Sequence, residues 1–223
     1  VPYIKISNTT GDNIDLLTKY LNSLQIYHDW DSLRTHNEFL TIEDIYQVNG
    51  VGVVVSGTLN SGVIHKGDRL MVGPIDGSFV EVTIKSIHDN YKNMVDILDA
   101  GCSGCLCIKS NERKTVLKKA ILRRGMYLIS KTHDSFTSYK FVAKVKILHH
   151  PTTIKKNYEP MIHCGSIRQT ARIIEIDKEH LRTGDQSLVT FQFKCRPEFI
   201  QLDKQIMFRE GKTKGIGVVT KVL

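Results

Sequence analysis

The chain has 223 residues, of which 41% are hydrophobic and 24% charged, and this is the composition of an ordinary globular protein. No apolar run approaches the roughly 18 residues of a membrane-spanning helix, so we do not expect the chain to span a bilayer. The net charge of +8 favours a polyanionic partner, most simply RNA. The first residue is Val1 rather than Met, and we expect a piece of a longer protein.

The first 24 residues predict one strand and one helix. A short apolar strand, Tyr3 to Ile6, precedes a Ser-Asn-Thr-Thr-Gly turn, after which apolar residues recur at helical spacing from Ile14 to Leu24. One strand and one helix cannot bury both faces of a sheet, so we expect the last βα unit of a larger domain. Residues 25–37 are polar and are expected to form a linker.

Residues 38–132 change to short alternating strands separated by turn sequences such as VNGVG, LNSG and PIDGS. Strands this short and closely spaced predict a small antiparallel barrel. The predicted strands are Leu40–Tyr46, Val51–Gly57, Arg69–Val72, Val80–His88 and Gly104–Ile108.

A polar bridge, Ser130–Ser138, leads into a second β domain, which we place at residues 133–223. Its predicted strands are Lys140–Leu148, Met161–Cys164, Thr170–Ile176, Ser187–Phe193, Gln205–Phe208 and Gly215–Val222. The sequence thus predicts a mainly β protein with two consecutive small antiparallel β-barrels, preceded by a strand-helix remnant.

Three of the five cysteines cluster in CSGCLC, at Cys102, Cys105 and Cys107. Soft thiolates favour zinc or iron–sulfur clusters, so a metal site is one interpretation. However, no second cysteine pair lies at zinc-ribbon spacing, and alternation places Cys105 and Cys107 on one face of a strand. Small packing residues in a barrel strand, without a metal, are the interpretation that we favour.

The tripeptide Gly211-Lys212-Thr213 has the letters that end a phosphate-binding P-loop. A P-loop also needs a glycine five positions earlier and a helix immediately afterwards. Ile206 stands at the first position, and the β-branched sequence KGIGVVTKVL follows. We therefore expect EGKTKG to be a hairpin connection between two closing strands.

The same stretch, FREGKTKGIGVVTKVL, resembles the C-terminal end of elongation factor Tu and its eukaryotic counterpart, which deliver aminoacyl-tRNA to the ribosome. FLTIEDIYQVNGVGVVVSGTLNSGVIHKGDRL is similar to their second-domain barrel. SNTTGDNIDLL, HHPTTI, HCGSIRQTA and LRTGD are similar to the "GTP-binding protein one and two" group, relatives of elongation factor 1 alpha. The resemblance covers nearly the whole chain.

The resemblance implies that residues 1–24 end a GTPase domain and that 38–132 and 133–223 are domains two and three of a translational GTPase. Ser7 and Asn8 would belong to the last guanine-contacting loop. The P-loop, the magnesium switch and the Asn-Lys-x-Asp motif are absent, so this chain by itself is expected neither to bind nor to hydrolyse GTP. In the parent, a GTP hydrolase, GTP and magnesium would be the cofactors.

In the elongation factors, domain two holds the aminoacylated 3′ end of tRNA. The resemblance places the acidic pair of this pocket on Glu43 and Asp44, and an α-amino group would need such acceptors. Two positions depart from the family, because Ser86 replaces a Glu and Asp89 an Arg. The other pocket positions are Tyr46, Ser56, His88, Ser103 and Arg124.

Domain three of these factors grips the backbone of the T-stem. The matching positions would make shape and phosphate contacts rather than read bases, and they are Thr170, Arg196, Arg209, Glu210 and Gly211. The implied protein is a cytoplasmic monomer that binds tRNA or another structured RNA, the ribosome and its own G domain, but no membrane. The alternative is that the barrels carry a partner protein, as in release-factor-like or quality-control GTPases.

Overall fold

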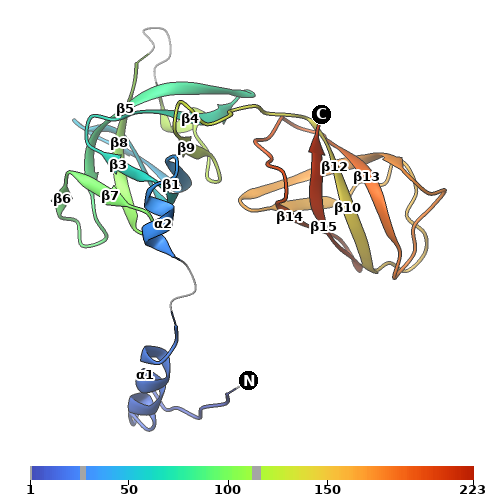
Figure 1. Cartoon of the computed structure of the whole chain (residues 1–223), viewed down its shortest axis with the longest axis horizontal. Coiled ribbons are helices and arrows are strands. Elements are labelled where there is room, and N and C mark those ends of the chain that lie inside the picture. Colours follow the sequence, from blue (N-terminus) through green and yellow to red (C-terminus); the bar gives the residue numbers. More distant parts are fainter. Residues whose placement is uncertain (1, 26–28, 112–116) are drawn as a thin grey trace.

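A computed structural model of the chain describes residues 2–25, 29–111 and 117–223. Two β-barrels lie side by side, and the N-terminal segment extends away from them (Figure 1). The predicted fold class is confirmed: the protein is mainly β, with two closed antiparallel barrels.

The first barrel closes through the strand order β4-β9-β1-β2-β8-β5, with β4 pairing back to β5. Its core is aliphatic, and Leu40, Val55, Leu59 and Leu128 are fully buried. The six strands are β1 (Phe39–Val48), β2 (Gly52–Ser61), β4 (Arg69–Ile75), β5 (Ser78–His88), β8 (Ser103–Ser110) and β9 (Tyr127–Ile129). Around them lie β6 (Met94–Val95), paired to β5, the two-stranded sheet of β3 (Val63–His65) and β7 (Ile97–Asp99), and the 3₁₀ turn η1 (Lys119–Ile121).

The second barrel closes in the order β10-β13-β12-β11-β14-β15. Four phenylalanines fill its centre, and none is more than 1% exposed: Phe141, Phe191, Phe193 and Phe208. The strands are β10 (Lys140–His149), β11 (Met161–Cys164), β12 (Ile167–Ile176), β13 (Gln186–Phe193), β14 (Gln205–Glu210) and β15 (Thr213–Val222).

Every predicted strand of the two barrels is present, usually extended by one to three residues at one or both ends. The two- and three-residue strands β3, β6, β7 and β9 were not predicted, because so short a run shows no alternation. The predicted strand Tyr3–Ile6 is wrong, since these residues form no strand in the structure. A strand needs a neighbour to accept its hydrogen bonds, and the described part of the chain supplies none.

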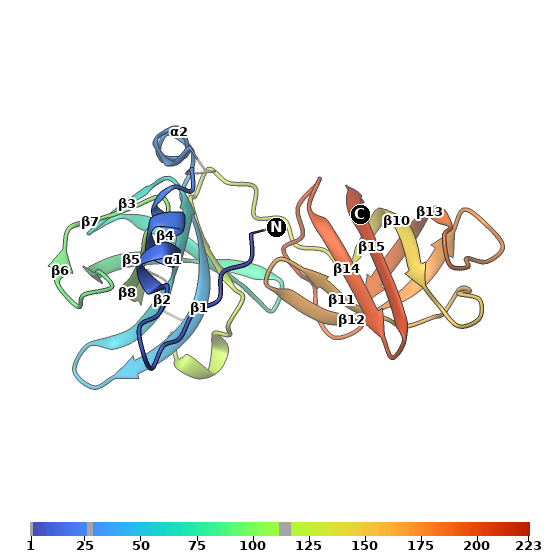
Figure 2. The same cartoon turned by 90° about the horizontal axis from the view of Figure 1, so that it is seen from below.

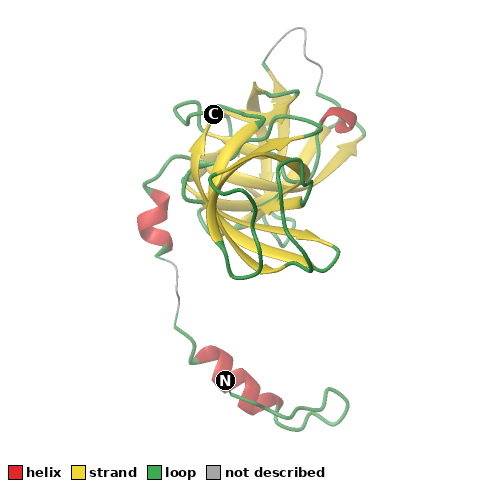
Figure 3. Ribbon diagram, turned by 90° about the vertical axis from the view of Figure 1, so that its right-hand side faces the viewer, coloured by secondary structure: helices red, strands yellow, loops and turns green. Residues whose placement is uncertain are grey.

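Two helices precede the first barrel and lie outside its sheet (Figure 3). Helix α1 (Ile14–Asn22) corresponds to the predicted helix and has no buried residue. Helix α2 (Trp30–Arg34) lies in the segment predicted as a linker, and the Asp29 carboxylate caps it by accepting from the Ser32 amide at 3.1 Å. Arg34 contacts Asp99 of β7 at 2.9 Å, so α2 is attached to the first barrel.

The two barrels lie next to each other (Figure 2), and an aromatic cluster forms the contact between them. Phe199, from the second barrel, is 4% exposed. It packs edge-on against Tyr127 and Phe79 of the first barrel, with both ring centroids at 5.4 Å. Phe39 and His133 complete the contact, at 6.4 and 5.7 Å from Phe199. A buried apolar contact of this kind joins the barrels into one body.

Candidate functional site

A β-bulge in β1 places the two predicted carboxylates on the same face of the first barrel. Ile42 pairs with Gly57 and Asp44 pairs with Ser56, so Glu43 is an additional residue with no partner on β2. In a regular strand, neighbouring side chains point to opposite faces. The bulge breaks this alternation, and both Glu43 and Asp44 face outward while Ile42 is buried.

Four side chains follow one another across β1, β2, β8 and β5 on this outer face. Asp44 pairs with Ser56, Ser56 with Cys105, and Cys105 with His88. Directly paired side chains on one face lie within about 5 Å at Cβ. The structure therefore brings three of the predicted pocket residues into one row. It adds Cys105, which sequence reasoning had assigned to packing.

The next row on the same face contains Tyr46, Val54, Cys107 and Ser86, again in cross-strand register. Tyr46 is 44% exposed, so its ring is accessible at the edge of the row. Asp89 has another role, because its Oδ1 accepts hydrogen bonds from the amides of Tyr91 and Asn93 at 2.9 and 2.8 Å. Its carboxylate therefore shapes the turn after β5.

The two carboxylates have different partners. The Thr58 hydroxyl donates to Glu43 Oε1 at 2.8 Å, and Ser103 Oγ lies 2.8 Å from the same hydroxyl. Asp44 is bound by Arg124, with Nη2 to Oδ2 at 2.7 Å and Nε to Oδ1 at 3.3 Å. The Ile45 amide and the Arg124 guanidinium lower the pKa of Asp44, although partial desolvation opposes them. The predicted residues Ser103 and Arg124 thus contact the acidic pair, directly or through one hydroxyl.

A second surface lies on the outer face of the second barrel. Lys214 of β15 pairs with Arg209 of β14, Arg209 with Met161 of β11, and Met161 with Thr170 of β12. Thr170 and Arg209 therefore lie in one row. Sequence reasoning missed Met161, which the pairing of β11 with β12 and β14 places between them, whereas Lys214 of the predicted hairpin lies beside Arg209.

Arg196 is placed differently from Arg209. It precedes the aromatic contact between the barrels, and its Nε contacts the Glu198 carboxylate at 3.0 Å. Arg209 and Glu210 are exposed at the end of β14, and no salt bridge of Arg209 is present among the described residues. The Arg196 side chain is also accessible, at 44% exposed, but its charge is already paired with Glu198.

Positive charge is concentrated in the second barrel. Residues 133–223 contain 16 Lys and Arg against 9 Asp and Glu, a net charge of +7. The preceding 132 residues contain 15 Lys and Arg against 14 Asp and Glu, a net charge of +1. The second barrel therefore carries almost all of the chain's net positive charge.

The Gly-Lys-Thr stretch is a hairpin, as predicted. Glu210 pairs with Thr213, which leaves Gly211 and Lys212 as a two-residue loop. Gly211 has φ of +54°, a conformation that favours glycine. The Thr213 side chain is buried, and its Oγ1 lies 2.6 Å from His150 Nδ1 and accepts from the Tyr158 hydroxyl at 3.0 Å. Thr213 thus anchors the hairpin to the barrel.

The cysteine cluster follows the predicted strand alternation, because Cys105 and Cys107 pair with Ser56 and Val54 on the outer face. Within residues 2–25, 29–111 and 117–223, no three His, Cys, Asp or Glu side chains are close enough together to hold a metal ion. Ser7 and Asn8 lie in the turn before α1, where Ser7 Oγ accepts from the Thr10 amide at 3.2 Å.

Comparison with known proteins shows what this two-barrel chain is similar to: the C-terminal part of GTP-binding proteins and of elongation factor 1-alpha. No family model matches it. It is 40% identical over 223 residues to GTP-binding protein 1 of Xenopus laevis, covering 100% of this chain and 33% of that protein. It is 36% identical over 226 residues to GTP-binding protein 2 of Homo sapiens, covering 99% of this chain and 36% of that protein.

The similarity extends to elongation factor 1-alpha. The chain is 24% identical over 255 residues to this factor from Cenarchaeum symbiosum (strain A), covering 100% of the chain and 55% of the factor. The chain thus spans about a third of the GTP-binding proteins and about half of the elongation factor. None of the described helices is long and apolar enough to cross a membrane.

Proposed function

We propose that the two barrels bind the acceptor and T-stem arm of an aminoacyl-tRNA. The first barrel would hold the aminoacylated 3′ end, and the second would contact the backbone of the T-stem. The observation that carries this proposal is the bulge in β1, which places two adjacent carboxylates on one outer face beside Arg124. An α-ammonium group needs carboxylate acceptors, and an ester or phosphate oxygen needs a donor such as guanidinium.

The small and the aromatic side chains of the same outer face are suitable for binding the terminal nucleotide of the tRNA. Ser56 and Cys105 are small, and Tyr46 and His88 stand at the two ends of adjacent rows. A base stacks on an aromatic or imidazole ring, and single-stranded RNA ends are recognised in this way. The predicted roles of Tyr46, Ser56 and His88 are compatible with this arrangement.

The second barrel supplies electrostatic attraction. Its net charge of +7 favours the phosphate backbone, and Arg209 is exposed in the row with Thr170 and Lys214. Contacts of this kind hold a helix by shape and charge rather than by sequence. In the longer parent protein, GTP and magnesium would be bound outside this chain, and the ribosome and the G domain would be further partners in the cytoplasm.

Filter binding with charged and uncharged tRNA across a salt series tests the proposal. We expect binding that weakens linearly on a log–log salt plot, with the charged form bound more tightly. Acetylating the α-amino group should abolish the preference for charged tRNA, because the acetylated nitrogen carries no positive charge. Equal binding of charged, uncharged and acetylated tRNA would reject the aminoacyl pocket and leave the protein-carrying alternative.

A further inference from the structure

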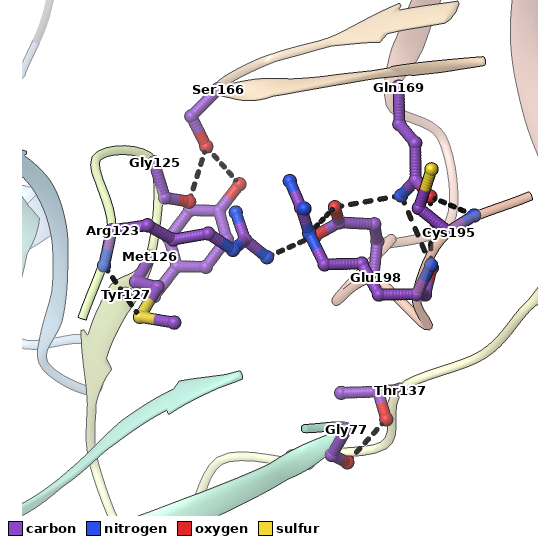
Figure 4. Close-up of polar contacts among 11 residues, drawn as sticks. Gly77, Arg123, Gly125, Met126, Tyr127, Thr137, Ser166, Gln169, Cys195 and Glu198 are labelled. Atoms are coloured by element: carbon purple, nitrogen blue, oxygen red, sulfur yellow. Dashed lines mark hydrogen bonds and ion pairs between the residues drawn. The ribbon is translucent and has the colours of Figure 1, made fainter. Parts of the chain in front are cut away.

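Glu198 is a buried carboxylate at the boundary between the barrels (Figure 4). Its side chain is 2% exposed and accepts from three side chains. Arg123 Nη2 lies 2.7 Å from Oε2, whereas Arg196 Nε and Gln169 Nε2 lie 3.0 and 2.9 Å from Oε1. A buried charge is stable only with such partners, and removing one of them is costly.

The partners of Glu198 come from both barrels. Arg123 precedes β9 of the first barrel, whereas Gln169 of β12 and Arg196 belong to the second. Arg123 is also the immediate neighbour of Arg124, which holds Asp44 in the proposed 3′-end pocket. Glu198 thus connects the arginine beside one proposed RNA surface with an arginine predicted to contact the T-stem.

The residues on both sides of Glu198 also pack against the first barrel. Phe199 enters the aromatic cluster, and Pro197 lies against Gly77 at the tip of the β4–β5 hairpin. Ser166 Oγ lies 2.9 Å from the Gly125 carbonyl oxygen and 2.7 Å from the Tyr127 hydroxyl (Figure 4). Apolar packing is non-directional, whereas the arginine pairs fix an orientation.

We propose that Glu198 is a positioning residue that holds the two RNA-binding surfaces in one orientation, so that a single continuous RNA arm engages both. This inference rests on the proposed function. Linking two weak sites at a matching separation raises the overall affinity by 10²- to 10⁴-fold or so, without any new contact. A scaffold whose two halves reorient independently loses part of that gain.

The experiment compares three RNA probes on the chain. The first is an aminoacylated acceptor-stem hairpin, the second is a T-arm hairpin, and the third joins both in one continuous minihelix. Glu198→Gln removes the charge at constant shape. Arg123→Met removes only the contact to the first barrel and leaves Arg196 and Gln169 on Glu198. Glu159→Gln is the matched control, because Glu159 also binds two cations, Arg172 and Lys194, but within the second barrel alone.

We expect Glu198→Gln and Arg123→Met to weaken binding of the minihelix by about tenfold and binding of each hairpin by less than about twofold. Glu159→Gln should leave all three affinities near those of the unaltered chain. Equal losses for all three probes, or no loss for the minihelix, would overturn the positioning role while leaving the proposed function intact.

Residual dipolar couplings measured without RNA test the positioning role of Glu198 separately from the proposed RNA binding. One alignment tensor should describe both barrels in the unaltered chain, and two different tensors should be needed after Glu198→Gln. If no probe binds the unaltered chain, the proposed function fails, and with it the RNA role of Glu198. A single tensor in Glu198→Gln would show that the charge does not set the orientation, whatever the RNA result.

Discussion

Arg124 binds the carboxylate of Asp44 across 80 residues of sequence, with Nη2 to Oδ2 at 2.7 Å. The two side chains are 73% and 32% exposed, so the pair lies at the surface. Exposed pairs of this kind contribute little to stability, and a ligand that supplies both an ammonium group and an anion can replace it.

Asp44→Asn should therefore affect recognition and leave stability nearly unchanged. We expect the preference for charged over uncharged tRNA to fall severalfold, because the α-ammonium loses a charged acceptor. The salt slope should change little, since Asp44 makes no phosphate contact in this scheme. Filter binding measures both quantities, and a parallel strengthening of charged and uncharged binding would show that Asp44 merely repels RNA.

Arg209→Ala should weaken tRNA binding whatever its sequence and flatten the salt dependence by about one unit of log–log slope or less. Arg196→Ala should have a smaller effect on the slope, because Glu198 already neutralises Arg196. Arg172→Ala is a suitable control, since Arg172 is paired with Glu159 and lies outside the row that contains Thr170 and Arg209. A larger change in slope for Arg196 than for Arg209 would contradict the assignment.

Gly77→Ala should disturb the contact between the barrels. A Cβ at Gly77 would lie 2.8 Å from Pro197 Cγ, and its φ is +84°. Gly67 has φ of +96° with nothing near its Cβ position, so Gly67→Ala reports the backbone strain alone. We expect urea unfolding to show a loss for Gly77→Ala about 1 kcal/mol or more greater than for Gly67→Ala. Equal losses would mean that the hairpin tip moves freely away from Pro197.

Burial raises the pKa of the Cys164 thiol from 9.0 to about 11. Above pH 9 the unfolded chain releases this proton while the folded chain retains it, so folding stability should fall between pH 9 and 11. The loss should approach about 3 kcal/mol, since one pKa unit corresponds to roughly 1.4 kcal/mol. Urea unfolding at several pH values should show a shallower decline for Cys164→Ala, and identical declines would assign the effect to other groups.

The chain should neither bind nor hydrolyse GTP, because Gly211 and Lys212 form a β-hairpin loop rather than a P-loop. Isothermal titration with GTP and magnesium should give no heat beyond dilution. Any turnover in a purified sample should survive Lys212→Ala and therefore come from another protein. Turnover that disappears with Lys212 would contradict this interpretation.

Most of the barrel strands could be predicted from sequence, because apolar and polar residues alternate along each strand. The bulge at Glu43 could not, since it depends on which residue of β2 faces each residue of β1. Resemblance to a family placed Glu43 and Asp44 in one pocket, but strict alternation would have put them on opposite faces. The short strand β9 likewise depends on its neighbours β1 and β4.

The contact between Arg123 and Glu198 could not be predicted, because 75 residues separate them and neither lies in a recognisable motif. Arg196 was predicted as a phosphate contact from the family resemblance alone, and the resemblance did not indicate its partner Glu198. The prediction of a strand at Tyr3–Ile6 was wrong for the opposite reason. Its sequence pattern is suitable for a strand, but the described part of the chain offers it no partner strand.

The bulge in β1 also determines which single-codon deletion the first barrel can tolerate. Loss of one codon inside a barrel strand normally reverses every later side chain, so that core residues face water. Glu43 is the exception, because it is the one residue of β1 without a counterpart on β2. An in-frame deletion of its codon would restore strict alternation between Ile42, Asp44 and Ile45 and leave a barrel with a single carboxylate. Lineages could thus gain or lose the acidic pair in one mutational step without rebuilding the fold.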